Sequence, residues 1–174
     1  MTKTTVLVTG GARSGKSAYA QQLAEQLPGP RLYLATAEVR DREMAARVAR
    51  HQRQRGPGWQ TLEEPRELAA ALRRSAAGFG VILVDCITLW LTNLFFASGE
   101  DPDSVLREVE RLAACLERCP VPVIMVTNEL GQGIVPENPL ARRFRDLAGR
   151  GNQLLAAACR EVYLVCCGLP LKIK

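Results

Sequence analysis

Short apolar runs rich in β-branched residues recur along the chain and predict buried strands. They cover Thr5–Thr9, Leu32–Ala35, Val81–Asp85, Val121–Thr127 and Val162–Cys167. Runs of this length, bounded by glycine, proline or charged residues, are typical of strands that are covered on both faces.

The longer stretches between these runs carry apolar residues at helical spacing. Val105, Val109, Leu112 and Leu116, for example, fall on one face of a helix. The predicted helices cover Lys16–Leu27, Asp41–Arg55, Arg66–Ala77, Thr88–Ala97, Asp103–Arg118 and Leu140–Ala158. Because strands alternate with helices, we predict an α/β fold with a mainly parallel sheet and helices on both faces.

Composition narrows the class of protein. The 174 residues, 47% hydrophobic and 24% charged, have the balance of a soluble globular protein, and we expect residues 1–174 to form one domain. No apolar run approaches the length of a membrane span, and the first residues show no basic-then-apolar leader. We therefore expect a cytoplasmic protein without a membrane span.

The net charge and the cysteine pattern indicate which kinds of ligand and metal ion to expect. A formal net charge of +5 favours anionic partners such as nucleotides, phosphorylated metabolites or nucleic acid. The six cysteines form no C-x-x-C pair and lie far in sequence from the single histidine, so we do not expect a zinc site. Most of them lie in apolar patterns, which predicts reduced thiols in the core.

One motif predicts nucleotide binding. The segment Gly10-Gly11-Ala12-Arg13-Ser14-Gly15-Lys16-Ser17 matches G-x-x-x-x-G-K-[ST], and it follows a predicted strand and opens a predicted helix. In such a loop the glycines turn backbone N–H groups onto phosphate oxygens, and the helix N-terminus adds partial positive charge. Lys16 is expected to reach the terminal phosphates and Ser17 to ligate Mg²⁺, so we predict a P-loop NTPase-like fold.

Asp85 ends an apolar strand, where P-loop proteins place an acid that holds Mg²⁺ directly or through water. The alternative is a helix N-cap, because an acid just before a helix is common. From the sequence we favour the metal role.

His51 lies in an arginine-rich helical stretch, with Arg47 and Arg55 one turn away on the same face. Neighbouring cations disfavour the imidazolium, and a neutral imidazole is a competent nucleophile. The same pattern is also that of a solvated helix face, which is the favoured interpretation without further information. Glu63 and Glu64 leave a similar choice between a nucleotide contact and the acidic start of the next helix.

Several segments together resemble one family. They are the phosphate loop, Tyr33–Ala37, the spacing Arg47…His51…Arg55…Trp59 with Glu63-Glu64-Pro65, Asp85–Asn93, Thr127–Pro136, Arg143-Phe-Arg-Asp with the later Gly149-Arg and Asn152-Gln153, and Gly168–Lys172. The chain thus resembles, nearly end to end, the bifunctional adenosylcobinamide kinase / adenosylcobinamide-phosphate guanylyltransferase family of cobalamin (vitamin B12) assembly. Gly151 is a departure, because an apolar residue is expected there, and it bears on helix packing.

The resemblance implies a two-step enzyme. The hydroxyl of adenosylcobinamide first takes the γ-phosphoryl group of ATP or GTP. GTP then transfers GMP to a histidine, and adenosylcobinamide phosphate takes up the GMP to give adenosylcobinamide-GDP. The histidine of the family falls on His51. A homotrimer with nucleotide sites near the subunit boundaries is also implied.

The same resemblance assigns nucleotide contacts and places the corrin substrate near the arginine-rich helix and the Asn128–Pro136 loop. The implied nucleotide contacts are the phosphate loop, Ala35, Thr36, Ala37, Gln52, Arg53, Gln54, Arg55, Glu63 and Asp85.

Two other classes of function compete with this interpretation. One is another P-loop kinase of a small metabolite that forms no covalent intermediate, in which His51 is dispensable. The other is a nucleic-acid-binding P-loop protein or a GTPase switch. Against the latter, only 5% of the residues are aromatic and no N-K-x-D guanine motif is evident. We therefore expect no nucleic-acid partner.

Overall fold

One seven-stranded sheet forms the centre of the computed structural model, which describes residues 4–38 and 55–174. The strand order is β3-β2-β4-β5-β1-β6-β7, and every neighbouring pair is parallel except β6 and β7. The strands are β1 (Thr5–Thr9), β2 (Arg31–Ala35), β3 (Trp59–Glu63), β4 (Val81–Asp85), β5 (Val123–Val126), β6 (Glu161–Cys166) and β7 (Leu169–Lys172). This arrangement confirms the predicted α/β fold.

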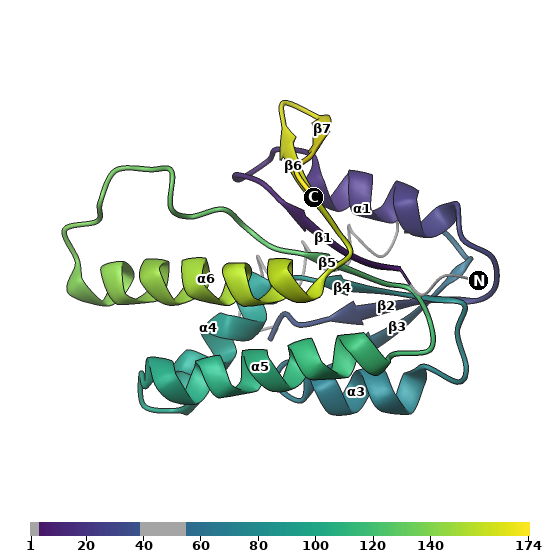
Figure 1. The fold of residues 1–174 in the computed structure, drawn as a ribbon, viewed down its shortest axis with the longest axis horizontal. Helices are drawn as coiled ribbons and strands as arrows, with labels where there is room; N and C mark the ends of the chain where they lie inside the picture. Colours follow the sequence, from purple (N-terminus) through teal and green to yellow (C-terminus); the bar gives the residue numbers. More distant parts are fainter. Residues whose placement is uncertain (1–3, 39–54) are drawn as a thin grey trace.

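Helices cover both faces of the sheet (Figure 1). Along β1, Val6 and Val8 pack into a cluster with α1 (Lys16–Glu25), whereas Leu7 points into a larger cluster on the opposite face. That larger cluster is built with α3 (Leu68–Ser75), α4 (Ile87–Ala97), α5 (Pro102–Arg118) and α6 (Pro139–Ala158). None of the helices in the described ranges is long and apolar enough to cross a membrane.

The strands β3 and β7 were not predicted from the sequence. Both are edge strands: β3 pairs only with β2, and β7 pairs only with β6. Their residues are mostly exposed, so neither carries the apolar run that marks a covered strand. Pro170 lies within β7, where the missing N–H costs no bond to a further strand. Residues 41–54 of the helix predicted to end at Arg55 lie outside the described residues.

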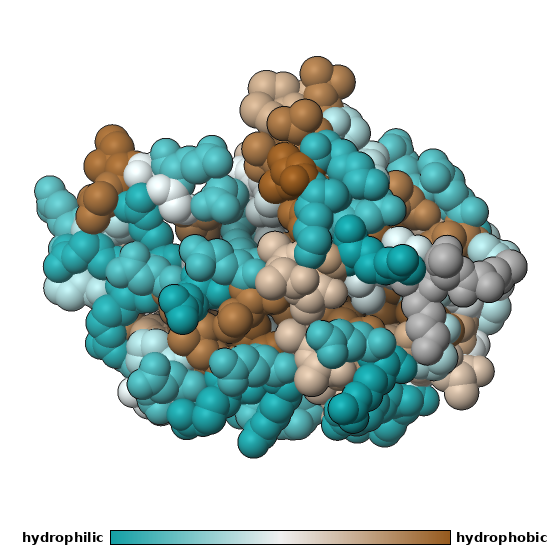
Figure 2. Space-filling model, viewed as in Figure 1, coloured by the Kyte–Doolittle hydropathy of each residue, from teal (hydrophilic) through white to brown (hydrophobic). Residues whose placement is uncertain are grey.

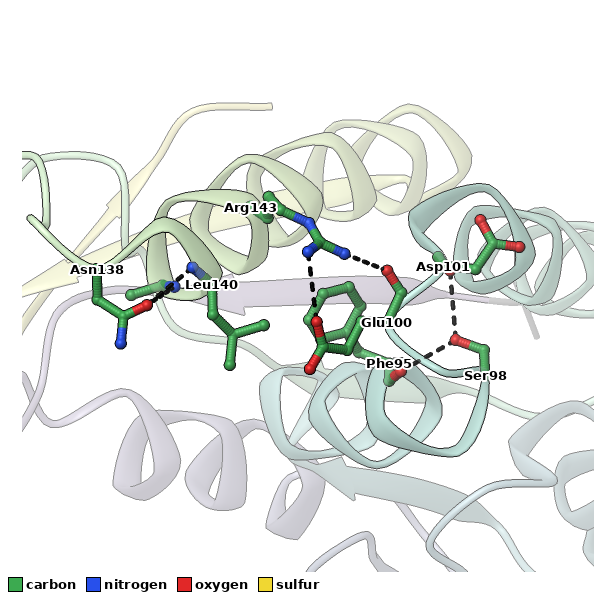
Figure 3. A network of polar contacts seen from close by, with 8 residues as sticks. Phe95, Ser98, Glu100, Asp101, Asn138, Leu140 and Arg143 are labelled. Atoms are coloured by element: carbon green, nitrogen blue, oxygen red, sulfur yellow. Dashed lines mark hydrogen bonds and ion pairs between the residues drawn. The ribbon is translucent and has the colours of Figure 1, made fainter.

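A polar network anchors the start of α6 (Figure 3). Arg143 donates to the backbone carbonyl of Glu100 at 2.6 Å and to its carboxylate at 3.3 Å. The Arg143 guanidinium carbon also lies 5.6 Å from the centroid of the Phe95 ring. Asn138 caps α6, because its side-chain oxygen accepts from the Leu140 N–H at 2.8 Å. The loop that follows β5 therefore rejoins the fold at a fixed point.

Gly151 brings α6 close to two other helices. It is buried, and a Cβ at this position would lie 3.4 Å from Leu91 Cδ1 in α4 and 3.7 Å from Val109 Cγ2 in α5. There is therefore room for a methyl group but not for a larger side chain unless the helices separate.

We predict that Gly151→Ala raises the free energy of unfolding by about 0.5–1 kcal/mol, because alanine is the better helix former and its methyl group fits. Urea denaturation measures the change. Gly149→Ala is the matched control: it lies in the same helix with nothing within 4 Å of the added Cβ. Stabilisation of the control but not of Gly151→Ala would mean that the three helices are packed too tightly for a methyl group.

The thiols form two groups. Cys86, Cys115, Cys119 and Cys159 are buried, as predicted for core cysteines, whereas Cys166 and Cys167 at the end of β6 are exposed. Burial raises the pKa of Cys159 to about 12, and burial together with the Asp85 charge does the same for Cys86.

We predict that Ellman's reagent at pH 8 modifies two of the six thiols rapidly, because Cys86 and Cys159 stay protonated and all four core thiols are covered. A Cys166→Ser/Cys167→Ser variant should show no rapid phase, and unfolding in guanidinium should expose the remaining four thiols. A third rapid thiol in the folded protein would contradict the burial of this group.

Candidate functional site

The phosphate loop joins β1 to α1 and needs glycine at two of its positions. A Cβ on Gly10 would lie 2.4 Å from the Val165 carbonyl oxygen and 2.6 Å from Ser14 Oγ, which no side chain tolerates. Gly15 has φ +95° and is the N-cap residue of α1. No side chain caps this helix, so its first N–H groups remain available to an anion.

Neighbouring elements hold the loop in place. The Glu129 N–H donates to the Gly10 carbonyl at 3.1 Å, and the Gly168 N–H donates to the Ser14 carbonyl at 2.8 Å. Lys16 is buried, and its Nζ donates to the Gly11 carbonyl at 3.0 Å. The backbone that would surround a phosphate is thus fixed from both sides.

Unsatisfied polar atoms gather at this loop and beside it. Within the described ranges, three buried side-chain polar atoms lack a hydrogen-bond partner: Thr9 Oγ1, Ser14 Oγ and Arg55 Nη1. Thr9 ends β1, and Ser14 lies in the phosphate loop. Since buried polar groups in proteins are nearly always paired, these atoms indicate places where a polar ligand binds.

A cavity of about 470 Å³ lies beside the loop, on the face of the sheet that α1 covers. It brings together the predicted site residues Ser17, Arg55 and Asp85, which are far apart in sequence. Its remaining lining is Ala18, Gln21, Gln22, Glu25, Tyr33 and Leu83. The volume is within the range of small-molecule sites.

Asp85 is half-buried at the carboxyl end of β4 and does not cap α4. The N-cap residue is Cys86, whose Sγ accepts from the Leu89 N–H at 3.5 Å. The capping alternative for Asp85 is therefore wrong. The carboxylate faces the cavity with the hydroxyl of Ser17, and one carboxylate plus one hydroxyl, completed by phosphate oxygens, suits Mg²⁺. No cluster of three or more metal-ligating His, Cys, Asp or Glu side chains occurs in residues 4–38 and 55–174.

Thr36 joins the end of β2 to the end of β4 through buried hydrogen bonds. It is fully buried, and its Oγ1 donates to the Cys86 carbonyl at 2.7 Å and accepts from the Cys86 N–H at 2.8 Å. Asn93 Nδ2 donates to the Thr36 carbonyl at 2.8 Å and to the Pro65 carbonyl at 3.1 Å. These contacts tie the end of β2 to the end of β4, between the buried Ala35 and the half-buried Ala37.

Glu63 and Glu64 have separate roles in the structure. Glu63 ends β3, in register with Ala35, and its side chain is exposed. Glu64 accepts from the Glu67 N–H at 2.9 Å just before α3, as the helix-start alternative expects. Only Glu63 therefore remains a candidate for a nucleotide contact.

The segment from Asn128 to Asn138 leaves the sheet next to the phosphate loop. Thr127 Oγ1 donates to Asn152 Oδ1 at 2.8 Å, and Asn152 Nδ2 donates to the Asn128 carbonyl at 3.1 Å. Beyond this anchor the segment projects from the fold (Figure 1), and Ile134 is 98% exposed. An arginine side chain from α6, Arg145, donates to the Gly131 carbonyl and holds the segment near the helix.

Four predicted site residues, His51, Gln52, Arg53 and Gln54, lie outside the described residues. Two participants in the site were not predicted as site residues: Thr9 and Tyr33. The alternation of side chains along β2 places Tyr33 on the same face as Ala35, and this is the one sequence signal that could have directed Tyr33 to the cavity.

Comparison with known proteins gives a match over nearly the whole chain. The sequence profile of the cobinamide kinase / cobinamide phosphate guanyltransferase family matches residues 6–173. The bifunctional adenosylcobalamin biosynthesis protein CobU of Salmonella typhimurium is 48% identical over 180 aligned positions, which cover 97% of this chain and 99% of that protein. The protein of the same name from Escherichia coli K12 is 45% identical, with the same coverage.

A third relative carries a related name. The bifunctional adenosylcobalamin biosynthesis protein CobP of Pseudomonas aeruginosa is 45% identical over 168 positions, covering 97% of this chain and 96% of that protein. Matches of this extent agree with the phosphate loop and the cavity described above, and they show that the chain belongs to the cobinamide kinase / cobinamide phosphate guanylyltransferase family.

Proposed function

We propose that this chain, acting as one nucleotide-binding domain, is a bifunctional enzyme of adenosylcobalamin biosynthesis. In the first reaction the hydroxyl oxygen of adenosylcobinamide attacks the γ-phosphorus of ATP or GTP, loses its proton and releases the nucleoside diphosphate. In the second, a histidine nitrogen attacks the α-phosphorus of GTP and releases pyrophosphate. A phosphate oxygen of adenosylcobinamide phosphate then attacks the same phosphorus, which frees the histidine and gives adenosylcobinamide-GDP.

The observation that carries the nucleotide part is the set of buried polar atoms without partners, Thr9 Oγ1 and Ser14 Oγ at the phosphate loop and Arg55 Nη1 at the neighbouring cavity. The uncapped N-terminus of α1 and the buried Lys16 add positive potential at the same place. A polyphosphate supplies the acceptor oxygens that these donors lack. The N–H groups, the lysine and the arginine would stabilise the charge that develops during transfer.

Ser17 and Asp85 are the residues that would hold Mg²⁺, because they line the same cavity next to the phosphate loop. Bound Mg²⁺ neutralises charge on the phosphate oxygens. Tyr33 lines the same cavity beside Asp85.

His51 is the proposed nucleophile of the second reaction, with Gln52, Arg53, Gln54 and Arg55 as neighbouring nucleotide contacts. His51 itself lies outside the described residues, but it is four residues from Arg55, which lines the cavity. Four residues of fully extended chain span about 14 Å at most, so the covalent chain keeps His51 within that distance of Arg55.

The proposed place for the corrin substrate is the hollow under the segment 128–138. A cavity of about 490 Å³ there is lined by Arg142, Arg145 and Arg150, and by the exposed Val135. The arginines are suited to binding the phosphate of adenosylcobinamide phosphate through charge-assisted hydrogen bonds. The apolar Val135 side chain is suited to packing against the methyl-rich edge of a corrin. The hydrogen bond from Glu129 to Gly10 joins this segment to the phosphate loop.

A homotrimer and a cytoplasmic location are proposed from the family resemblance. Exposed hydrophobic side chains give some physical support to an oligomer. Figure 2 shows them projecting from the segment before α6 and from the β6–β7 hairpin. Ile134, Leu169, Leu171 and Ile173 are between 58% and 98% exposed, which is unusual for a group of large apolar residues.

We predict that wild-type protein incubated with GTP and Mg²⁺ gains the mass of one GMP, in an acid-labile and base-stable form, and that His51→Ala gains none. The reason is that a phosphoramidate on the histidine nitrogen is the proposed intermediate. Intact-protein mass spectrometry measures the adduct, and GTP binding by calorimetry is the control for both proteins. No adduct on a wild-type protein that binds GTP would favour a kinase without a covalent intermediate.

We predict that Asp85→Asn lowers kcat of both reactions about 100-fold and shifts the Mg²⁺ concentration needed for half-maximal rate upward, because a neutral amide binds the cation weakly. Initial rates at several Mg²⁺ concentrations test this. Asp103→Asn, an equivalent change on the surface of α5, should leave both rates unchanged. An unaltered Mg²⁺ dependence in Asp85→Asn would remove this carboxylate from the metal site.

A further inference from the structure

Tyr33 lines the cavity together with Arg55 and Asp85. It comes from the middle of β2 and is 9% exposed. The guanidinium carbon of Arg55 lies 3.3 Å from the centroid of its ring, which is direct stacking of one flat group on another. Tyr33 also lies beside Asp85, which lines the same cavity. Burial and the neighbouring Asp85 charge raise the pKa of Tyr33 far above its ordinary value.

Arg55 is otherwise weakly held. It is 8% exposed, and its one side-chain hydrogen bond within the described residues runs from Nη2 to Thr61 Oγ1 at 3.5 Å, the outer limit for such a bond. Its Nη1 is buried without an acceptor, and no described acid lies within ion-pair distance of the guanidinium. A buried cation without an anion is costly, so this group is arranged for an anion that no residue in 4–38 or 55–174 supplies.

The stacking fixes the direction of the guanidinium. Arginine presents its N–H groups in one plane, and a plane laid on the tyrosine ring can turn only about the axis between the two groups. The edge-on Trp59 ring, 6.5 Å from the Tyr33 ring, supports Tyr33 in turn. Lysine cannot replace this arrangement, because its ammonium group has no plane to stack.

We propose that Tyr33 is a positioning residue, which holds the Arg55 guanidinium at the cavity so that Arg55 Nη1 donates to a phosphate oxygen. The inference rests on the proposed nucleotide-binding function and names how that site is organised. The ring acts on Arg55 and the hydroxyl is not needed for the stacking, so the two parts of the side chain separate by mutation. Tyr33→Phe keeps the ring, and Tyr33→Leu removes both.

The first experiment measures binding of inorganic tripolyphosphate by calorimetry without Mg²⁺. Arg55→Ala, Arg55→Lys and Tyr33→Leu should each weaken binding about 10- to 100-fold, the effect of losing one charge-assisted hydrogen bond. Tyr33→Phe should bind within about twofold of wild type, since it keeps the stacking surface. Arg55→Lys leaves Tyr33 intact, so it tests the planar requirement even if Tyr33→Leu folds poorly. Wild-type affinity in Arg55→Lys, or equal losses in the two Tyr33 variants, would overturn the proposal.

The second experiment uses chemical rescue. Guanidinium chloride at non-denaturing concentrations should restore tripolyphosphate binding to Arg55→Ala about tenfold, and likewise to Arg55→Ala/Tyr33→Phe, with sodium chloride at equal ionic strength as the control. Arg55→Ala/Tyr33→Leu should show no rescue, because the added cation has no ring to stack on. Rescue independent of the ring would overturn the proposal, and merely structural damage would not be repaired by guanidinium.

These results separate this inference from the proposed function. A wild-type protein that binds tripolyphosphate through Arg55 and Tyr33, yet neither phosphorylates cobinamide nor transfers GMP, would contradict the function and support the positioning role. A protein active in both reactions whose tripolyphosphate binding is indifferent to Tyr33 and Arg55 would do the opposite.

Discussion

The interior strand β1 sets the position of the candidate site. It is hydrogen-bonded to β5 on one side and to β6 on the other, and both of its faces are buried. The phosphate loop leaves this strand at Gly10, whose Cα lies so close to the Val165 carbonyl of β6 that a side chain is excluded. A loop packed in this way cannot shift unless the sheet shifts, so the anion site has the rigidity of the core.

The other half of the site depends on strand ends that lie in register. Glu63, Ala35 and Asp85 are direct partners across β3, β2 and β4. The carboxyl ends of these three strands form one edge of the sheet. The hydrogen bonds of Thr36 and Asn93 hold the ends of β2 and β4 together at that edge. The carboxylate that would bind Mg²⁺ and the loop that would bind phosphate are therefore fixed to the same sheet, two strands apart.

The sequence predicts the parts of this arrangement that have a local cause. Buried strands leave apolar runs, so five strands and five of the described helices follow from the pattern, and the phosphate loop leaves a motif. The edge strands β3 and β7 do not, because exposed strands carry no such run. The stacking of Arg55 on Tyr33 also leaves no trace in either segment, since it joins residues brought together only by the chain's path.

The unsatisfied donors link the stability of the fold to its affinity for an anion. Each buried polar atom without a partner costs the folded protein about 1–3 kcal/mol, and Thr9, Ser14 and Arg55 carry that cost at the phosphate loop and at the cavity beside it. The rest of the fold offsets this free-energy cost, because β1 is hydrogen-bonded to a strand on each side and the sheet is covered by apolar clusters on both faces. A ligand that satisfies these donors recovers the cost as binding energy, without ordering the groups first. A polyphosphate that reached these three atoms would therefore stabilise the folded protein.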